Sequence, residues 1–190
     1  MSYPDLIAHV RGTSRYINDL PEPEGLLHAA AVTSPIPHAR LRAIGVIAAL
    51  LADGVEAVLT AADIPGDNEI GGIIADEALF ATDTIHFAGQ PVALVVAETM
   101  QQARTAAREV RLDLDELPAI FDPRDAATHG EIIGAERTIE AGDVDAAWSE
   151  CDVVVEGTAE TAGQEHLYLE TQAALAVPEE GGRIKIFSST

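Results

Sequence analysis

A short apolar run at residues 91–97 constrains the fold more than any other feature of this 190-residue sequence. Its residues, PVALVVA, are apolar without interruption over the length of one strand, which is typical of a strand buried on both faces. Thr99 and Gln102 follow with the spacing of a capping box, and apolar side chains then recur on one helical face until about Glu109. Residues 110–115 alternate between apolar and charged, as in a strand with one solvated face. The sequence therefore predicts a strand–helix–strand unit whose first strand is central in a sheet.

An earlier part of the chain repeats this order of elements. Residues 47–52 are predicted to form a short helix that Gly54 ends in the left-handed conformation, and residues 55–60 are sufficiently β-branched for a strand. Two more strands are predicted upstream, at residues 26–33 and 38–46. They are separate, because the prolines between them have no N–H to donate to a strand ladder. We therefore predict a mixed fold of the α/β (α+β) class.

The rest of the chain gives weaker structural signals. The polar residues 9–20 carry no predicted element, and residues 65–80 are expected to be irregular. Residues 122–142 are interpreted as a loop at a domain boundary, because Pro and Gly interrupt every period there. Beyond it we predict one or two helical turns at residues 143–149, a strand at 152–158, and a hairpin of residues 171–177 and 183–188.

Composition argues against several classes of partner. The sequence has 11 Lys and Arg and 32 Asp and Glu, and the resulting formal charge of −21 would repel nucleic acids and anionic lipid surfaces. The single Cys151 cannot supply the thiolates of an iron–sulfur cluster. The longest apolar segment, residues 43–52, is far shorter than the ~20 residues that span a membrane, and the N-terminus lacks the pattern of a signal peptide. We expect a cytoplasmic protein without nucleic-acid or membrane partners.

Common catalytic and metal-binding motifs do not occur in the sequence. The six histidines are scattered, so none is assigned to a metal. The carboxylates of residues 113–116 and 136–145 are interpreted as solvated faces, because the whole chain is acidic. No residue is therefore assigned a catalytic role.

Residues 163–170, GQEHLYLE, differ from a plain strand, because they combine a glycine with an amide, carboxylates, an imidazole and a phenol. The amide of Gln164 offers two donors and two acceptor lone pairs, so it can present an N–H to an oxo group or to another ligand. A polar network that merely docks two domains would use the same residue types. The residues alone leave both interpretations open.

Residues 163–177, GQEHLYLETQAALAV, resemble the first molybdenum-site signature of the xanthine dehydrogenase and aldehyde oxidase family. Five further segments resemble, in order, the α/β hammerhead domain of that family: residues 9–16 with 19–21, 34–40, 58–65, 89–92 and 117–119. The resemblance implies a hammerhead domain at residues 1–127, a linker at 128–142, and the first strands of a molybdopterin-binding domain at 143–190.

The resemblance also implies a chemistry, which is hydroxylation of a purine, hypoxanthine or xanthine, with oxygen derived from water. Electrons would pass from a molybdenum–molybdopterin cofactor to 2Fe-2S clusters and FAD on partner subunits or other domains. Gln164 is the one cofactor-binding residue that the resemblance implies in this chain. It would not bind the molybdenum directly but would form a hydrogen bond to an oxo ligand of the metal. Gly163, Glu165, His166 and Glu170 support the motif. Ala162 stands where the family often has a second glycine.

In this family the residues that orient the substrate, and the catalytic base, lie beyond the part that this chain resembles. We therefore expect a truncated N-terminal piece of the molybdenum subunit, inactive alone, whose partners are the rest of that subunit and an iron–sulfur/FAD subunit. Two alternatives remain: an aldehyde oxidase or related molybdenum hydroxylase, and a noncatalytic hammerhead interaction module.

Overall fold

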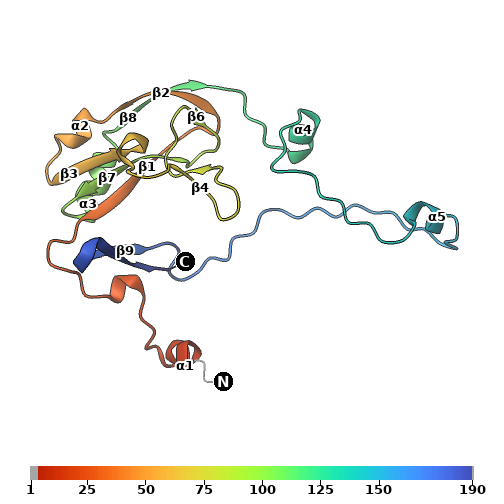
Figure 1. The fold of residues 1–190 in the computed structure, drawn as a ribbon, viewed down its shortest axis with the longest axis horizontal. Coiled ribbons are helices and arrows are strands. Elements are labelled where there is room, and N and C mark those ends of the chain that lie inside the picture. Colours follow the sequence, from red (N-terminus) through yellow and green to blue (C-terminus); the bar gives the residue numbers. More distant parts are fainter. Residues whose placement is uncertain (1–3, 190) are drawn as a thin grey trace. The chain divides into compact units, whose positions relative to one another are not determined.

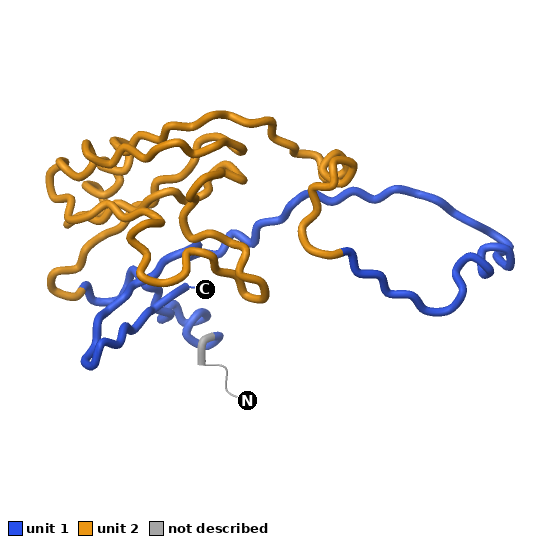
Figure 2. Tube along the Cα trace, turned by 45° about the horizontal axis from the view of Figure 1, so that its top comes forward, with its two compact units in different colours: residues 1–22, 136–190 blue, residues 23–135 orange. Residues whose placement is uncertain are grey.

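The structure is a computed structural model that describes residues 4–189. The chain forms two compact units: residues 23–135, and residues 1–22 together with 136–190 (Figure 2). The sequence-based bounds of 1–127, 128–142 and 143–190 stay a prediction, and in space residues 1–22 group with the C-terminal part instead. No helix within residues 4–189 is long and apolar enough to cross a membrane.

The unit of residues 23–135 contains a three-stranded antiparallel sheet with the predicted strand at its centre (Figure 1). The central strand β7 (Pro91–Ala97) pairs with β1 (His28–Thr33) on one side and with β3 (Val55–Thr60) on the other. The side chains of Val92, Ala93 and Val95 are fully buried. The uninterrupted apolar run is thus explained by neighbours on both edges and cover on both faces.

Helix α3 (Met100–Ala107) packs on this sheet against β1 and β7. Thr99 caps it, because its hydroxyl oxygen accepts the Gln102 N–H at 3.2 Å. The Gln102 side chain binds the Thr99 hydroxyl at 2.7 Å, where the predicted capping box would have it bind the backbone. The helix buries only the small side chains of Ala103 and Ala106, so it approaches the sheet closely. A second short helix, α2 (Ile47–Leu50), was also predicted.

A second three-stranded antiparallel sheet has the order β6-β2-β8. It consists of β2 (Ala39–Gly45), β6 (Thr84–Ile85) and β8 (Arg111–Glu116). Leu41 and Ile85 form its core together with Val92 of β7. Strand β8 buries Leu112 and Leu114 partly and exposes its charged residues, which confirms the prediction of one solvated face.

Regular elements lie within and beside the segments of this unit that were predicted to be irregular. Residues 61–78 contain η2 (Ala61–Asp63) and a small ladder of β4 (Glu69–Ile70) with β5 (Glu77–Ala78). Helix α4 (Pro123–Thr128) lies inside the predicted loop, which is a correction. Asp122 caps α4, Pro123 occupies a first-turn position that needs no N–H donor, and hydrogen bonds from Arg124 lower the pKa of the Asp122 carboxyl.

The other unit has fewer regular elements. Its N-terminal part holds α1 (Pro4–Arg11), where no element was predicted, and the single 3-10 turn η1 (Ile17–Asp19). Its C-terminal part holds α5 (Val144–Trp148) and the predicted hairpin, formed by β9 (Ala174–Glu179), η3 (Glu180–Gly182) and β10 (Arg183–Ser188).

The predicted strand at residues 152–158 is wrong. Residues 153–162 have no ladder partners (Figure 1), and Val153 and Val155 are 77% and 88% exposed. Their β-branched side chains favour an extended backbone, but a strand also needs a neighbour to bind its N–H and C=O groups.

Candidate functional site

The five residues predicted for the site lie in one segment, between the extended residues 153–162 and strand β9. Gly163, Gln164, Glu165 and His166 are exposed, and only Glu170 is half-buried. The Gln164 amide makes no hydrogen bond with any residue in the described range 4–189, so both of its donors are available.

Contacts inside the segment are local. The Glu165 carboxylate accepts the N–H of His166 at 3.0 Å, and the rings of His166 and Tyr168 stack with centroids 5.4 Å apart. Leu167 lies between the two rings in sequence and has a φ of 52°, a left-handed conformation that a leucine rarely adopts. The segment is therefore an irregular loop with exposed polar groups rather than a strand, and it is called the site turn below.

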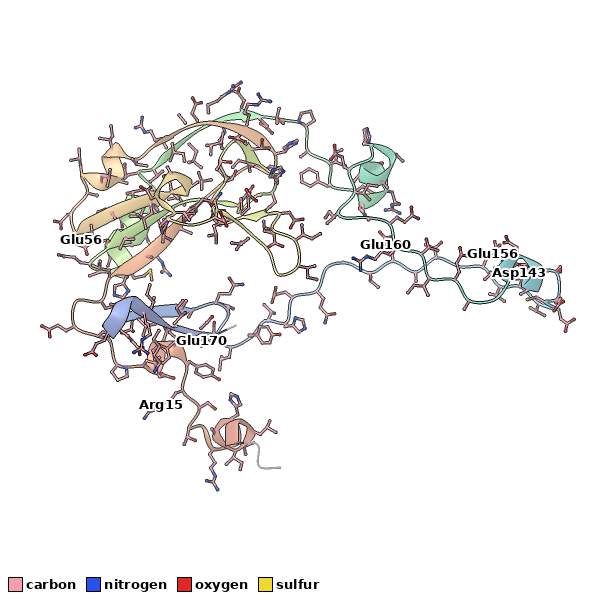
Figure 3. The ribbon with its side chains drawn as sticks, viewed as in Figure 1. Arg15, Glu56, Asp143, Glu156, Glu160 and Glu170 are labelled. Atoms are coloured by element: carbon pink, nitrogen blue, oxygen red, sulfur yellow. The ribbon has the colours of Figure 1, made fainter. Side chains whose placement is uncertain are left out.

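Glu170 connects this segment to the beginning of the chain. Its carboxylate Oε1 accepts the backbone N–H of Ile17, the first residue of η1, at 2.8 Å. Figure 3 shows Glu170 beside the N-terminal segment that also carries Arg15. A shallow hollow at this junction is lined by His9, Tyr16, Tyr168, Leu169, Glu170 and Ser189. Sequence reasoning did not identify Ile17, because no local pattern predicts a contact between residues 153 positions apart.

The turn η1 is held in place by a cap of its own. The Asp19 carboxylate accepts the N–H of Tyr16 at 2.9 Å, while the Asp19 N–H binds the Tyr16 carbonyl at 3.0 Å. The sequence Tyr16-Ile-Asn-Asp19 indicates this cap, since an Asp three residues after the start of a turn can accept the backbone N–H of the first residue.

The histidines make structural contacts rather than a cluster. His9 binds the Ser14 hydroxyl at 2.8 Å, His38 binds the Pro118 carbonyl at 2.6 Å, and His129 binds the Asp125 carbonyl at 2.7 Å. Among residues 4–189, no three His, Cys, Asp or Glu side chains gather as metal ligands would. What the site offers chemically is therefore a free amide and a set of local hydrogen bonds, not a metal-ligand set.

Two family models match the chain. The model described as "Aldehyde oxidase and xanthine dehydrogenase, a/b hammerhead domain" matches residues 11–118. The model of the molybdopterin cofactor-binding domain matches residues 126–190, which include the candidate site.

Individual proteins agree with these models. Xanthine dehydrogenase 1 of Arabidopsis thaliana is 41% identical over 185 residues, which are 95% of this chain and 14% of that protein. Aldehyde oxidase 4 of Rattus norvegicus is 37% identical over 91% of this chain and 13% of its own length. The structure of the aldehyde oxidoreductase from Desulfovibrio gigas superposes with a TM-score of 0.84 at 31% identity, covering 98% of this chain and 23% of that one. The chain thus spans about a seventh of the length of the curated relatives.

Proposed function

The chain belongs to the aldehyde oxidase and xanthine dehydrogenase family, and on this premise we propose that it works within an enzyme that hydroxylates hypoxanthine and xanthine with oxygen from water. It is a hammerhead domain followed by the start of a molybdopterin-binding domain. The observation that carries the proposal is the unpartnered Gln164 amide, displayed on a turn within the part that matches the cofactor-binding domain.

The donor set of the turn fits one specific contact with the cofactor. An uncharged amide with a free N–H suits a hydrogen bond to an oxygen atom carried by a metal, and Gly163 has no atom within 4 Å of where a Cβ would stand, so a ligand can approach its backbone. The molybdenum cofactor would supply the two-electron chemistry. Gln164 would hold the cofactor by donating a hydrogen bond to it, while Glu165, His166 and Glu170 would hold the turn.

Exposed apolar side chains support a chain that works inside a larger assembly. Leu167 and Leu169, in the part that matches the cofactor-binding domain, are 79% and 85% exposed. We infer that further parts of a molybdenum subunit cover them, and that the 2Fe-2S clusters and FAD are held elsewhere, since this chain has a single Cys.

An aldehyde-oxidising enzyme is the second candidate. It is favoured by the 37% identity to an aldehyde oxidase, only slightly below the identity to the xanthine dehydrogenases. The two candidates differ in substrate and share the role of Gln164. Turnover of the assembled enzyme with xanthine and with an aromatic aldehyde separates them, and a clear preference for the aldehyde would contradict the purine assignment.

The role of Gln164 is tested in the assembled enzyme by Gln164→Ala. We expect kcat to fall roughly tenfold to a hundredfold, because a hydrogen-bond donor to the cofactor would be lost, with a smaller effect on KM. Gln101→Ala is a matched control, since Gln101 is an exposed amide on α3 in the other unit. Unchanged turnover in Gln164→Ala would remove the role assigned to this residue.

A further inference from the structure

We propose that Glu170 is a positioning residue, whose carboxylate fixes the turn that carries Gln164 by accepting the backbone N–H of Ile17. This inference rests on the proposed function of Gln164 and adds a role for the N-terminal segment. Through one hydrogen bond, a 3-10 turn near the beginning of the chain would hold a site residue about 150 positions away.

The donor in this bond is available because of the geometry of η1. The first N–H groups of a helical turn have no acceptor inside the turn. In η1 the Asp19 carboxylate binds the N–H of Tyr16, which leaves the N–H of Ile17 for another acceptor. Glu170 supplies that acceptor at 2.8 Å, and a carboxylate forms a stronger hydrogen bond to an N–H than a neutral oxygen does.

The hydrogen bond between Glu170 and Ile17 matters for the site turn because few other contacts fix that segment. On the C-terminal side of Glu170, Ala173 and Ser189 exchange hydrogen bonds that extend the β9–β10 hairpin. On its N-terminal side, back to Gln164, the hydrogen bonds and ring contacts within the described part of the chain join only near neighbours. Glu170 therefore makes the first long-range hydrogen bond after Gln164, and without it the turn is tethered only from Ala173 onward.

The hydrogen bond itself is tested in the assembled enzyme by amide hydrogen exchange. We expect the Ile17 amide to exchange roughly tenfold faster in Glu170→Ala, because the N–H loses its acceptor. Glu170→Gln keeps an acceptor oxygen and should restore most of the protection. Ile17→Val is the matched control, since it changes the side chain and keeps the N–H.

The consequence for the site is tested by Ile17→Pro in the assembled enzyme. Proline removes the N–H donor at the start of η1, and Tyr16 already has the extended backbone, φ −100° and ψ 170°, that a following proline requires. Proline also replaces the half-buried Ile17 side chain, so Ile17→Ala, which loses that side chain and keeps the N–H, is the control and should turn over like wild type. We expect Ile17→Pro and Glu170→Ala each to lower kcat roughly tenfold, with KM less affected, because a misplaced donor weakens transition-state contacts. The double variant should be no slower than either single one, and Glu170→Gln should be close to wild type.

The outcomes separate this inference from the proposed function. Normal turnover in Ile17→Pro and Glu170→Ala, combined with slow turnover in Gln164→Ala, would overturn the positioning role alone. Slow turnover in Glu170→Ala with an unchanged Ile17 exchange rate would overturn it too, since Glu170 would then act by another route. Normal turnover in Gln164→Ala contradicts the proposed function, whatever the exchange rate of Ile17 shows.

Discussion

At the scale of single residues, the site turn depends on an unusual backbone at Leu167. A φ of 52° brings the Leu167 side chain close to its own carbonyl and costs roughly 1–2 kcal/mol relative to the right-handed conformation. The Leu167 side chain is 79% exposed, so its own burial does not offset that cost. The stacked rings of His166 and Tyr168 and the bond between Glu165 and the His166 N–H are the observed contacts that favour the turn.

A pair of substitutions at Leu167 tests whether this conformation matters for the site. Glycine adopts positive φ without strain, so Leu167→Gly should leave turnover of the assembled enzyme within about twofold of wild type. A β-branched residue disfavours positive φ, so Leu167→Val should lower kcat roughly fivefold by shifting the turn. Steady-state kinetics of both variants decides the matter, and equal turnover in the two would mean that the left-handed residue is irrelevant to Gln164.

At the scale of elements, α3 packs on β7, and Thr99 caps the helix where the chain passes from the strand to the helix. Helix α3 buries only alanines at its centre, so its packing tolerates little movement against the sheet. A cap that satisfies the Gln102 N–H sets where the helix begins and how its alanines face β7.

Loss of this cap should lower the stability of the whole unit of residues 23–135. We expect Thr99→Ala to reduce its free energy of unfolding by about 1 kcal/mol. Thr105→Ala is the matched control, because Thr105 is exposed in the interior of the same helix, where alanine is at least as favourable. Urea unfolding followed by circular dichroism measures both variants, and an equal loss in the two would show that the cap contributes nothing.

The predicted elements were right where local pattern and tertiary neighbours agree. The apolar run of β7 lies between two strands, as its pattern predicts, whereas the valines at 153–155 carry similar β-propensity and have no strand beside them. Helix α4 was missed although Asp122 and Pro123 are ordinary start signals, because the nearby glycines dominated the interpretation. The five residues proposed for the site stay a prediction from sequence, and the bond between Glu170 and Ile17 depends on a long-range arrangement that no local pattern contains.

At the scale of the whole molecule, exposed apolar surface and strong negative charge coexist. Val155, Leu169 and Ile139 are 88%, 85% and 97% exposed, and within residues 6–22 and 136–189 no hydrophobic side chain is buried, so the described part of the unit around the site turn has no core. The fully buried residues lie in the other unit, where Ile85, Val92 and Val95 are the largest. The hammerhead part can therefore fold around its own core, while the cofactor-binding part needs additional surface to cover its apolar residues.

This division predicts that the 190-residue chain, purified alone, neither retains stoichiometric molybdenum nor hydroxylates xanthine. Gln164 offers only the hydrogen bonds of a single amide, and the residues in the range 4–189 contain no cluster of metal-ligating side chains. A net charge of −21 also opposes binding of an anionic, phosphate-bearing cofactor. Elemental analysis after dialysis measures the metal, with the assembled enzyme as the positive control. Stoichiometric molybdenum on the isolated chain would contradict the prediction, because retention would then require a set of contacts that the site turn does not display.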